Sequence, residues 1–339
     1  MPVPPTPLRR LVVAPLVLLV ELAFVLISPV SLVIGTLASL FTGGWRPVRM
    51  LAIAVTYAWR HIAATLACVG LWLGSGFGLR AGSPRMQRAY YALLRWFVGG
   101  IYRTVVGAAR VEVRMTESEA AEAALTAGER PVVVLSIHAG HGDSFLVIWQ
   151  LLCRWSRRPR IVMHERLQLD PLIDILGRRL PNRFVDPRGG DTEVEIAAMA
   201  RELDPAGAVL IFPEGGNFSA ARRQRSIERL ERLGHDEEAA TARAIRNLSA
   251  PRPGGALAAI EAAPGADVVF VGHTGFPATA REMWKQLPHE QTIEVQLWHV
   301  PCGDIPDGHD ERIEWLFDWW RRLDGWVDER GAAHRSPGA

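Results

Sequence analysis

The chain has 339 residues, of which 49% are hydrophobic and 22% are charged, and its formal net charge is +2. This apolar fraction is sufficient for a folded core and excludes an intrinsically disordered chain. The three cysteines, Cys68, Cys153 and Cys302, are too few and too widely spaced to form a disulfide scaffold or a metal knuckle.

The charge is distributed unevenly along the chain. Residues 1–111 contain eleven arginines and a single acid, Glu21, so this segment carries +10. The remaining residues contain 27 basic and 35 acidic side chains and carry −8. The nearly neutral total therefore hides a basic, apolar head and an acidic body, and we expect the head to lie in and against an anionic bilayer.

Two long apolar runs lie in the head. Residues 11–41 include one charged side chain, and residues 50–79 include only Arg60 and His61 as chargeable groups. A bilayer-spanning helix needs about 20 apolar residues, so each run is long enough to cross a membrane. Two prolines in the first run also allow a shallow hairpin that enters and leaves one leaflet. A secretory signal peptide, the alternative, would have a shorter apolar core and a small-residue cleavage site.

Residues 1–80 are therefore predicted to form N-terminal membrane segments. Charges inside such segments are costly, so Glu21 and Arg60 could pair across the two runs, or Arg60 and His61 could reach the membrane interface. Arginines flank both runs, which leaves the orientation open. Two full spans return the body to the side on which the N-terminus starts, and we expect the cell inner membrane with the body on its cytoplasmic side.

The segment 81–110 is predicted to be an amphipathic interfacial helix. Its residues 86–106 mix aromatic side chains with Arg88, Arg95 and Arg103. This composition is typical of a helix that lies at an anionic membrane surface. The alternative is a helix packed against the domain that follows, and both can hold on different faces.

From residue 111 to residue 330, short β-rich runs alternate with polar helical stretches, and residues 331–339 are expected to form a flexible tail. The alternation predicts an α/β fold with a mostly parallel central sheet flanked by helices, preceded by the N-terminal hydrophobic helical membrane region. The predicted strands are 111–115, 132–137, 160–163, 183–185, 208–212, 268–272 and 293–300. The predicted helices are 117–127, 144–154, 171–179, 192–203, 255–261 and 312–328, with a solvated helical insertion or helix pair at 219–246.

The passage 132–143 carries the first chemical signal. A buried strand ends at His138, and Asp143 follows five positions later, near the start of the next helix. A carboxylate there can accept the Nδ1 proton of the imidazole, which leaves Nε2 free to take a proton from a hydroxyl group. Because reactive groups collect where strands end in such sheets, we predict His138 as a general base and Asp143 as its partner.

A second signal follows the predicted strand 208–212. Glu214 would lie at the end of that strand, where it could hold a substrate hydroxyl or brace the loop. Gly215 and Gly216 are expected to leave backbone N–H groups open to an oxyanion.

A third signal follows the predicted strand 183–185. Arg188 offers a guanidinium fork that suits a phosphate group. The alternative is an ion pair between Arg188 and a neighbouring acid, Asp186 or Asp191.

Together these passages make the chain resemble the glycerolipid (lysophospholipid) acyltransferase family, membrane enzymes that acylate lysophosphatidic acid. The family's hallmark is a histidine and an aspartate separated by four residues, matched by His138 and Asp143. Its second block, a hydrophobic strand ending in an arginine, is matched by residues 184–188, with a proline before the arginine. Its third block, Phe-Pro-Glu-Gly, is matched by residues 212–215, and its fourth, an apolar strand, is matched weakly by 269–277.

The third block departs from the family pattern just after its glycine. Gly216 and Asn217 stand where Thr-Arg or a similar pair is usual, so a nearby basic residue, Arg222, Arg223 or Arg225, could supply the phosphate contact. Residues 225–226, 250–255 and 314–324 are similar to the branch that includes the lysocardiolipin and long acylglycerophosphate acyltransferases. The resemblance covers residues 85–326, with the apolar runs ahead of it.

The resemblance implies transfer of a fatty acyl chain from acyl-CoA or acyl carrier protein to a lysophospholipid hydroxyl, in one step and without a metal or other cofactor. The acceptor would be 1-acylglycerol-3-phosphate, or else another lysophospholipid or polar lipid. His138, Asp143 and Glu214 would be catalytic, and Gly215 or a neighbouring amide would stabilise the oxyanion. The phosphate would be bound by Arg188 together with Arg252. The expected partners are these substrates and membrane lipid, with acyl carrier protein as the alternative donor and no nucleic acid.

Two other function classes compete with this hypothesis. A metallohydrolase could use His138, His141 and Asp143 as metal ligands, because two histidines and an acid are a common donor set. No second ligand cluster with a metal-like spacing accompanies them. A noncatalytic membrane scaffold could keep the same fold, although the intact His138–Asp143 pair argues against it.

Overall fold

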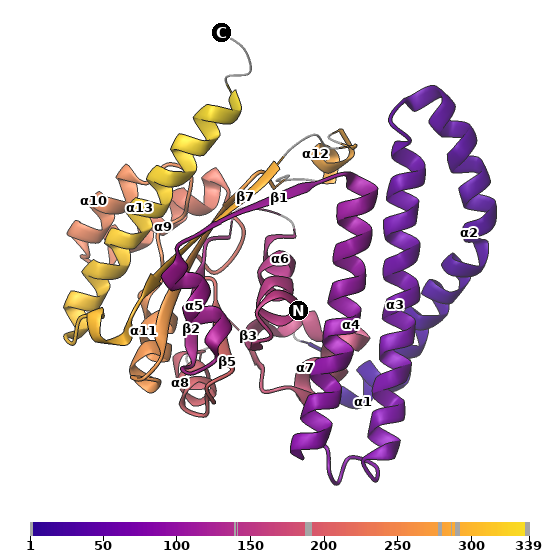
Figure 1. Ribbon diagram of the computed structural model, residues 1–339, viewed down its shortest axis with the longest axis horizontal. Helices are drawn as coiled ribbons and strands as arrows, with labels where there is room; N and C mark the ends of the chain where they lie inside the picture. Colours follow the sequence, from indigo (N-terminus) through magenta and orange to yellow (C-terminus); the bar gives the residue numbers. More distant parts are fainter. Residues whose placement is uncertain are drawn as a thin grey trace.

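The computed structural model describes residues 3–138, 140, 142–186, 192–276, 280–285, 287–288 and 292–335. A layer of long helices from the N-terminal third stands beside a seven-stranded sheet that shorter helices cover (Figure 1). Helix α4 (Pro84–Ala109) lies between the longest helices and the sheet. This arrangement confirms the predicted α/β body with an apolar helical region ahead of it.

The two apolar runs form a helical hairpin. Helix α1 (Thr6–Leu8) and the π-helical turn η1 (Arg9–Val13) lead into α2 (Ala14–Thr42), and α3 (Arg46–Gly74) returns beside it. Both are long and apolar enough to cross a membrane, and their most apolar 18-residue windows have mean hydropathies of 2.7 in Thr6–Thr42 and 1.3 in α3. Only 11% of the most apolar window of the first helix is buried, so its hydrocarbon side chains face outward.

The chargeable groups inside the hairpin pair differently from the expectation. Glu21 Oε2 lies 2.7 Å from His61 Nδ1, not beside Arg60. Arg60 donates to the Trp96 carbonyl at 2.7 Å and stacks over the Trp96 ring, with its guanidinium carbon 4.4 Å from the ring centroid. Successive residues of an α-helix point about 100° apart, so His61 faces α2 while Arg60 faces α4.

Helix α4 packs its aromatic face against the body. Tyr90, Tyr91 and Phe97 are buried, and Tyr102 stacks on Trp149 with 3.6 Å between the ring centroids. Trp96, in contrast, is 42% exposed. The contacts of this helix therefore favour packing on the following domain along one face, and its role at a membrane surface stays a prediction for the other.

The sheet is mostly parallel, with one reversed edge. Its strand order is β1-β7-β6-β2-β5-β3-β4, and β6, β2, β5, β3 and β4 are parallel to one another. β7 is antiparallel to β6, and β1 is parallel to β7. The strands are β1 (Glu112–Glu117), β2 (Val132–Ser136), β3 (Arg158–His164), β4 (Arg183–Val185), β5 (Gly207–Ile211), β6 (Asp267–Thr274) and β7 (Thr292–Val300).

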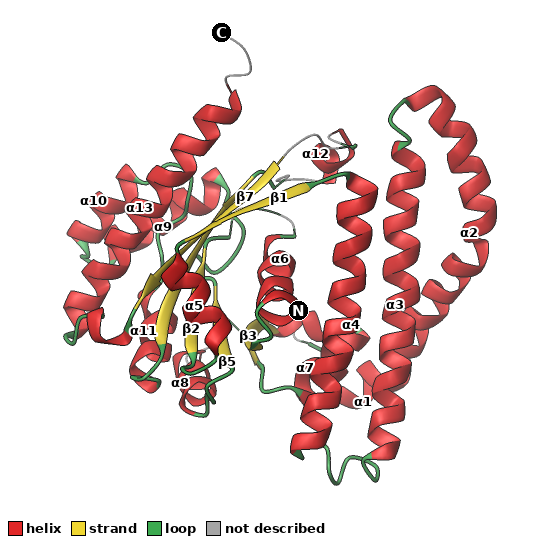
Figure 2. Ribbon diagram, viewed as in Figure 1, coloured by secondary structure: helices red, strands yellow, loops and turns green. Residues whose placement is uncertain are grey.

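Helices cover both faces of the sheet, so its central strands are apolar on both sides (Figure 2). Along β2, Val133 and Leu135 join the core under α8, α11 and α13, whereas Val132 and Val134 join the core under α5 and α6. Continuous apolar runs are typical of parallel strands buried on both faces. The covering helices are α5 (Glu119–Ala127), α6 (Asp143–Trp149), α8 (Thr192–Arg201), α11 (Pro253–Ala262) and α13 (His309–Arg335).

The remaining elements lie around this core. The 219–246 stretch forms a helix pair, α9 (Ala220–Arg232) and α10 (Asp236–Ala244), as predicted. Helix α7 (Pro171–Arg179) has the predicted bounds, and the Asp170 side chain caps it by accepting a hydrogen bond from Ile173 N at 2.9 Å. Helix α13 runs to Arg335, so it continues past residue 330 into the segment expected to be a tail. The short elements are η2 (Gln150–Arg154), η3 (Glu165–Leu169), α12 (Ala280–Lys285) and η4 (Cys302–Asp304).

Candidate active site

The backbone of His138 is held on both sides where the chain leaves β2. The Ile137 amide still donates to the Val271 carbonyl at 3.1 Å, which continues the β2–β6 ladder by one residue. The His138 amide donates to Glu214 Oε1 at 2.8 Å, and the His138 carbonyl accepts from Phe218 N at 2.7 Å. His138 therefore has a fixed place at the carboxyl end of the central strand.

The side chains of His138 and Asp143 form the predicted pair. His138 Nδ1 lies 2.9 Å from Asp143 Oδ2. Asp143 is the first residue of α6, and the residue before it, Gly142, has φ +98°, a conformation that favours glycine. Asp143 is 1% exposed, whereas His138 is 19% exposed. Within the described part of the chain, only Nδ1 of the His138 ring is hydrogen-bonded, and no described residue bonds to Nε2.

Asp143 is built to remain ionised. Burial alone would raise the pKa of Asp143, but the hydrogen bond to His138, the nearby His273 and the amide of Gly140 hold the pKa below its usual value. Gly140 N donates to Oδ2 at 3.2 Å, and the backbone and hydroxyl of Ser144 donate to Oδ1. A carboxylate held in this way fixes the proton of His138 on Nδ1 and leaves Nε2 as the basic atom.

Both side-chain oxygens of Glu214 accept hydrogen bonds from backbone amides, so Glu214 braces the site. Its Oε1 accepts from His138 N at 2.8 Å and its Oε2 accepts from Ser249 N at 2.9 Å. The residue is 2% exposed, and burial raises the pKa of Glu214 to about 8 against the opposing effect of these two N–H donors. Of the two interpretations of Glu214, the geometry favours the brace over a contact with a substrate hydroxyl.

The Gly215–Gly216 turn differs in part from the expectation. Gly215 N donates to the Phe212 carbonyl at 2.9 Å, so this amide is already engaged and is not open to an oxyanion. Gly215 has φ +71°, which favours glycine, and the Arg252 guanidinium lies 3.6 Å from where its Cβ would be. The Arg222 guanidinium lies in the same way against Gly216, at 2.8 to 3.0 Å. The turn is thus lined by two arginines.

Three guanidinium groups gather beside this turn, those of Arg222, Arg229 and Arg252, which we call the arginine cluster. Partial burial and the charge of Arg222 lower the pKa of Arg252, and burial and the charge of Arg252 lower the pKa of Arg229. Within the described part of the chain, none of the three forms an ion pair with a carboxylate, and Arg229 Nε has no hydrogen-bond partner. Like charges held together without an ion-paired carboxylate favour an anionic ligand.

Comparison with known proteins shows what the segment around this site is similar to. The model of the family described as Acyltransferase matches residues 110–273, which contain His138, Asp143, Glu214 and the arginine cluster. Over this segment the chain is similar to the acyltransferase family. No curated protein matches the chain. A solved structure with a similar arrangement is the crystal structure of the 1-acyl-sn-glycerophosphate (LPA) acyltransferase PlsC from Thermotoga maritima, with a TM-score of 0.47 and 13% identity over 80% of this chain and 98% of that one.

One predicted site residue of the acyltransferase segment cannot be placed. Arg188 lies outside the described residues, as do His141 and Asp191. The strand before it, β4, pairs in parallel with β3 and ends at Val185, at the same edge of the sheet as the end of β2. The role of Arg188 in binding phosphate therefore stays a prediction.

Two residues of the candidate site were missed in the sequence. Arg229 lies seven positions after Arg222, two helical turns along α9, and that spacing was the available signal within an otherwise dense run of charges. His273 lies on β6, where Val271 is the register partner of Ser136 on β2, so it comes beside the end of β2. Only the pairing of strands far apart in the sequence brings it there.

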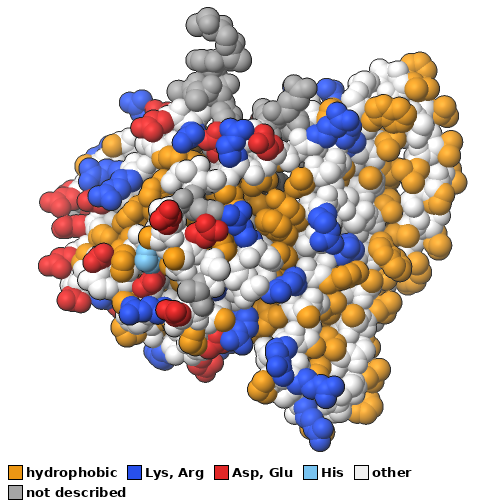
Figure 3. Space-filling model, viewed as in Figure 1, with side chains coloured by type: hydrophobic (Ala, Val, Ile, Leu, Met, Phe, Trp, Pro, Cys, Tyr) orange, Lys and Arg blue, Asp and Glu red, His pale blue; other side chains and the backbone are white. Residues whose placement is uncertain are grey.

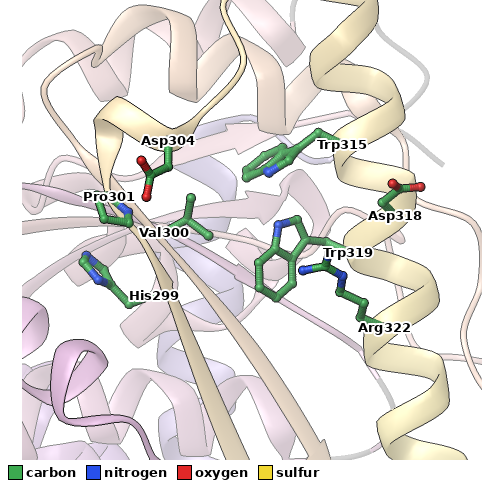
Figure 4. Close-up of a pocket in the computed structure, with 8 residues that line it drawn as sticks. All are labelled: His299, Val300, Pro301, Asp304, Trp315, Asp318, Trp319 and Arg322. Carbon is green, nitrogen blue, oxygen red and sulfur yellow. The ribbon is translucent and has the colours of Figure 1, made fainter.

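The cavity in Figure 4 is not the candidate site around His138. It has a volume of about 270 Å³ and lies where Trp315 and Trp319 of α13 face Val300 and Asp304. Val300 is the register partner of Val268 at the beginning of β6, whereas His273 lies near the end of that strand. The cavity is therefore at the opposite end of the sheet from His138.

Proposed function

We propose that the chain is a membrane-bound lysophospholipid O-acyltransferase. It moves a fatty acyl chain from an acyl thioester to a lysophospholipid hydroxyl, with 1-acylglycerol-3-phosphate as the acceptor and phosphatidic acid as the product. The observation that carries the proposal is the His138–Asp143 pair, 2.9 Å apart at the end of a central strand, inside the segment that matches the acyltransferase family.

In the proposed mechanism, Asp143 holds the Nδ1 proton, and His138 Nε2 takes the proton of the acceptor hydroxyl. The oxygen attacks the thioester carbonyl, so that a C–O bond forms and the C–S bond breaks. The proton on Nε2 then passes to the departing thiolate, and the histidine returns to its starting state. Because the Gly215 amide is engaged, the Gly216 amide is the better candidate for stabilising the oxyanion.

The arginine cluster supports a phosphorylated acceptor. Arg252 N donates to the Pro213 carbonyl at 2.9 Å, and Pro213 directly precedes Glu214, which accepts from the His138 amide. The cluster is thus tied by backbone contacts to the loop behind His138. A guanidinium fork binds phosphate oxygens in a fixed orientation, which would place the acceptor hydroxyl relative to Nε2.

The apolar hairpin supports a membrane location. Figure 3 shows hydrophobic side chains gathered along the side of the molecule formed by the long N-terminal helices. Exposed apolar surface of this extent marks a membrane or partner contact, and α2 and α3 have the length and composition for the former. We propose the inner membrane, with the catalytic segment on its cytoplasmic side. The exposed apolar side chains of α2 include Leu16, Leu19, Val20, Leu26, Ile27, Val30, Val33, Ile34, Leu37 and Leu40.

The metallohydrolase hypothesis is less compatible with the site. It requires His138, His141 and Asp143 to surround one ion, yet His138 Nδ1 and Asp143 Oδ2 lie at hydrogen-bond distance from each other. Stoichiometric zinc in the purified protein, with activity lost to chelators, would favour the metallohydrolase.

The test is a panel of lysophospholipids offered to the purified full-length protein in detergent, with labelled acyl-CoA or acyl carrier protein as donor and mass spectrometry as readout. We expect labelled phosphatidic acid as the main product and none from the His138→Ala variant. Transfer only to another lysophospholipid would show that the acceptor is that lipid and not 1-acylglycerol-3-phosphate. Absence of transfer to every acceptor, or equal transfer by His138→Ala, would overturn the proposed function.

A further inference from the structure

A second histidine contacts the same carboxylate from the next strand. His273, near the end of β6, is 1% exposed. Its Nε2 lies 2.9 Å from the carbonyl oxygen of Ile137, the residue just before His138, and 3.7 Å from Asp143 Oδ2. His273 therefore contacts both the backbone that carries the base and the acid that orients it.

The contacts fix the tautomer of His273. A carbonyl oxygen only accepts hydrogen bonds, so Nε2 must carry the proton. The other nitrogen, Nδ1, is buried and has no hydrogen-bond partner among the described residues. A bare Nδ1 in that position costs less than a buried, unpaired N–H of an imidazolium would. The geometry is thus that of a neutral ring with Nε2 protonated.

A neutral ring matters because Asp143 has a single negative charge to offer. Among the described residues, the titratable groups that act on His273 are Asp143 on α6 and His138 at the end of β2, and the ring of Phe276 lies edge-on to it at 5.2 Å between centroids. A protonated His273 would compete with the His138 imidazolium for that charge. Burial lowers the pKa of His273, which keeps this competitor uncharged.

We propose that His273 is a positioning residue for the acyltransferase base: its Nε2–H fixes the Ile137 carbonyl, and its neutral ring gives Asp143 a dipole without a second positive charge. The proposal rests on the proposed function for its catalytic consequence. The tautomer and charge proposed for the His273 ring are properties of the folded chain and do not depend on the proposed function.

The kinetic test compares three full-length variants. His273→Leu removes the donor at similar volume, and His273→Gln keeps an amide N–H that can reach the Ile137 carbonyl. His299→Leu, a histidine substitution at the other end of the sheet, is the matched control. We expect His273→Leu to lower kcat roughly 10-fold with little change in the acceptor KM, because the base is misplaced and the acceptor site is intact. His273→Gln is expected to restore most of kcat.

The pH profile separates positioning from a general loss of structure. Without the Nε2–H dipole, Asp143 directs its charge to His138 alone, so the acidic limb of kcat/KM should move to higher pH in His273→Leu and stay in place in His273→Gln. The proposal would be overturned if the acidic limb of His273→Leu coincided with that of the wild type. It would also be overturned if His273→Gln lost as much kcat, and shifted the limb as far, as His273→Leu.

A second readout needs no activity. In the ¹⁵N-histidine NMR spectrum of the detergent-solubilised protein, assigned with His138→Ala and His273→Leu, His273 should be a neutral Nε2–H tautomer at pH 6.5, the ordinary pKa of a histidine. A half-protonated His273 at this pH would contradict the inference. If the wild-type protein transfers no acyl chain, the proposed function fails, and the spectrum still decides the state of His273.

Discussion

His138 and His61 are both paired with acids, and they are used in opposite ways. His138 Nδ1 is hydrogen-bonded to Asp143, and no described residue bonds to its Nε2. His138 is 19% exposed. His61, in the helical hairpin, is 1% exposed, and its Nδ1 and Nε2 lie 2.7 Å from Glu21 and 3.0 Å from Asp170. The same residue type thus appears once with an open nitrogen and once with both nitrogens engaged.

The difference shows what a candidate base requires. An imidazole with one oriented and one open nitrogen can exchange a proton with a substrate, whereas an imidazole between two carboxylates is held in place. His61 joins α2 through Glu21 to the capping residue of α7, Asp170, which also accepts from Tyr57. We therefore interpret His138 as the histidine that takes part in the chemistry and His61 as the one that fastens the helical hairpin to the body.

The largest effect is expected from Asp143→Asn. The substituted amide cannot hold the Nδ1 proton as a carboxylate does, so acyl transfer should fall roughly 10³- to 10⁴-fold while the protein still folds. Asp267→Asn is the matched control, because Asp267 also bonds a histidine, His299, at 3.0 Å, but at the other end of the sheet. Initial rates of labelled phosphatidic acid formation measure both, and comparable losses in the two variants would contradict the assignment.

The second largest effect is expected from His61→Ala, and it concerns stability. Removal of the ring leaves the carboxylates of Glu21 and Asp170 facing each other without the imidazole between them, which should lower the free energy of unfolding by about 3 kcal/mol. His309→Ala removes a histidine that is 64% exposed and bonds Glu261 at 3.2 Å, so it should change little. Thermal unfolding in detergent compares the two variants with the wild type. Equal melting temperatures for His61→Ala and the wild type would show that His61 does not fasten the hairpin to the body.

A smaller effect is expected from Arg252→Ala in the arginine cluster. Loss of a charge-assisted contact to phosphate should raise the acceptor KM about 10-fold with a smaller change in kcat. Arg243→Ala is the control, because Arg243 is exposed and pairs with Glu231 away from the turn. Steady-state kinetics with varied acceptor measure the effect, and an unchanged KM would exclude Arg252 from binding phosphate.

The smallest effect is expected from Glu214→Gln, in the pH dependence of stability. Burial raises the pKa of Glu214 from an ordinary 4.5 to about 8. A carboxyl group whose pKa is raised in the folded state stabilises the fold below pH 4.5, and that stabilisation is lost as the pH rises through about 8. The melting temperature of the wild type should therefore decline over this range more steeply than that of Glu214→Gln, and identical slopes would refute the brace as a buried, protonatable group.

The sequence predicted the parts of the molecule that depend on local spacing. The pairing of His138 with Asp143 follows from a strand, a glycine turn and a helix start within six residues, and the α7 bounds follow from Asp170, Pro171 and the apolar period. The helical hairpin follows from hydropathy alone.

What the sequence could not predict depends on residues that only the fold brings together. His273 reaches Ile137 through the β2–β6 register, and Glu21 selects His61 over Arg60 through the rotation of α3 against α2. The engaged Gly215 amide is a similar case, because a Phe-Pro-Glu-Gly pattern does not show which N–H groups the turn itself consumes.

The most direct measurement compares His138→Ala with His61→Ala in one assay of labelled acyl transfer to 1-acylglycerol-3-phosphate, normalised to folded protein. The account predicts that His138→Ala has no measurable transfer and that His61→Ala retains the wild-type rate per folded molecule. Retained transfer by His138→Ala, with loss in His61→Ala, would contradict the assignment of the two histidines.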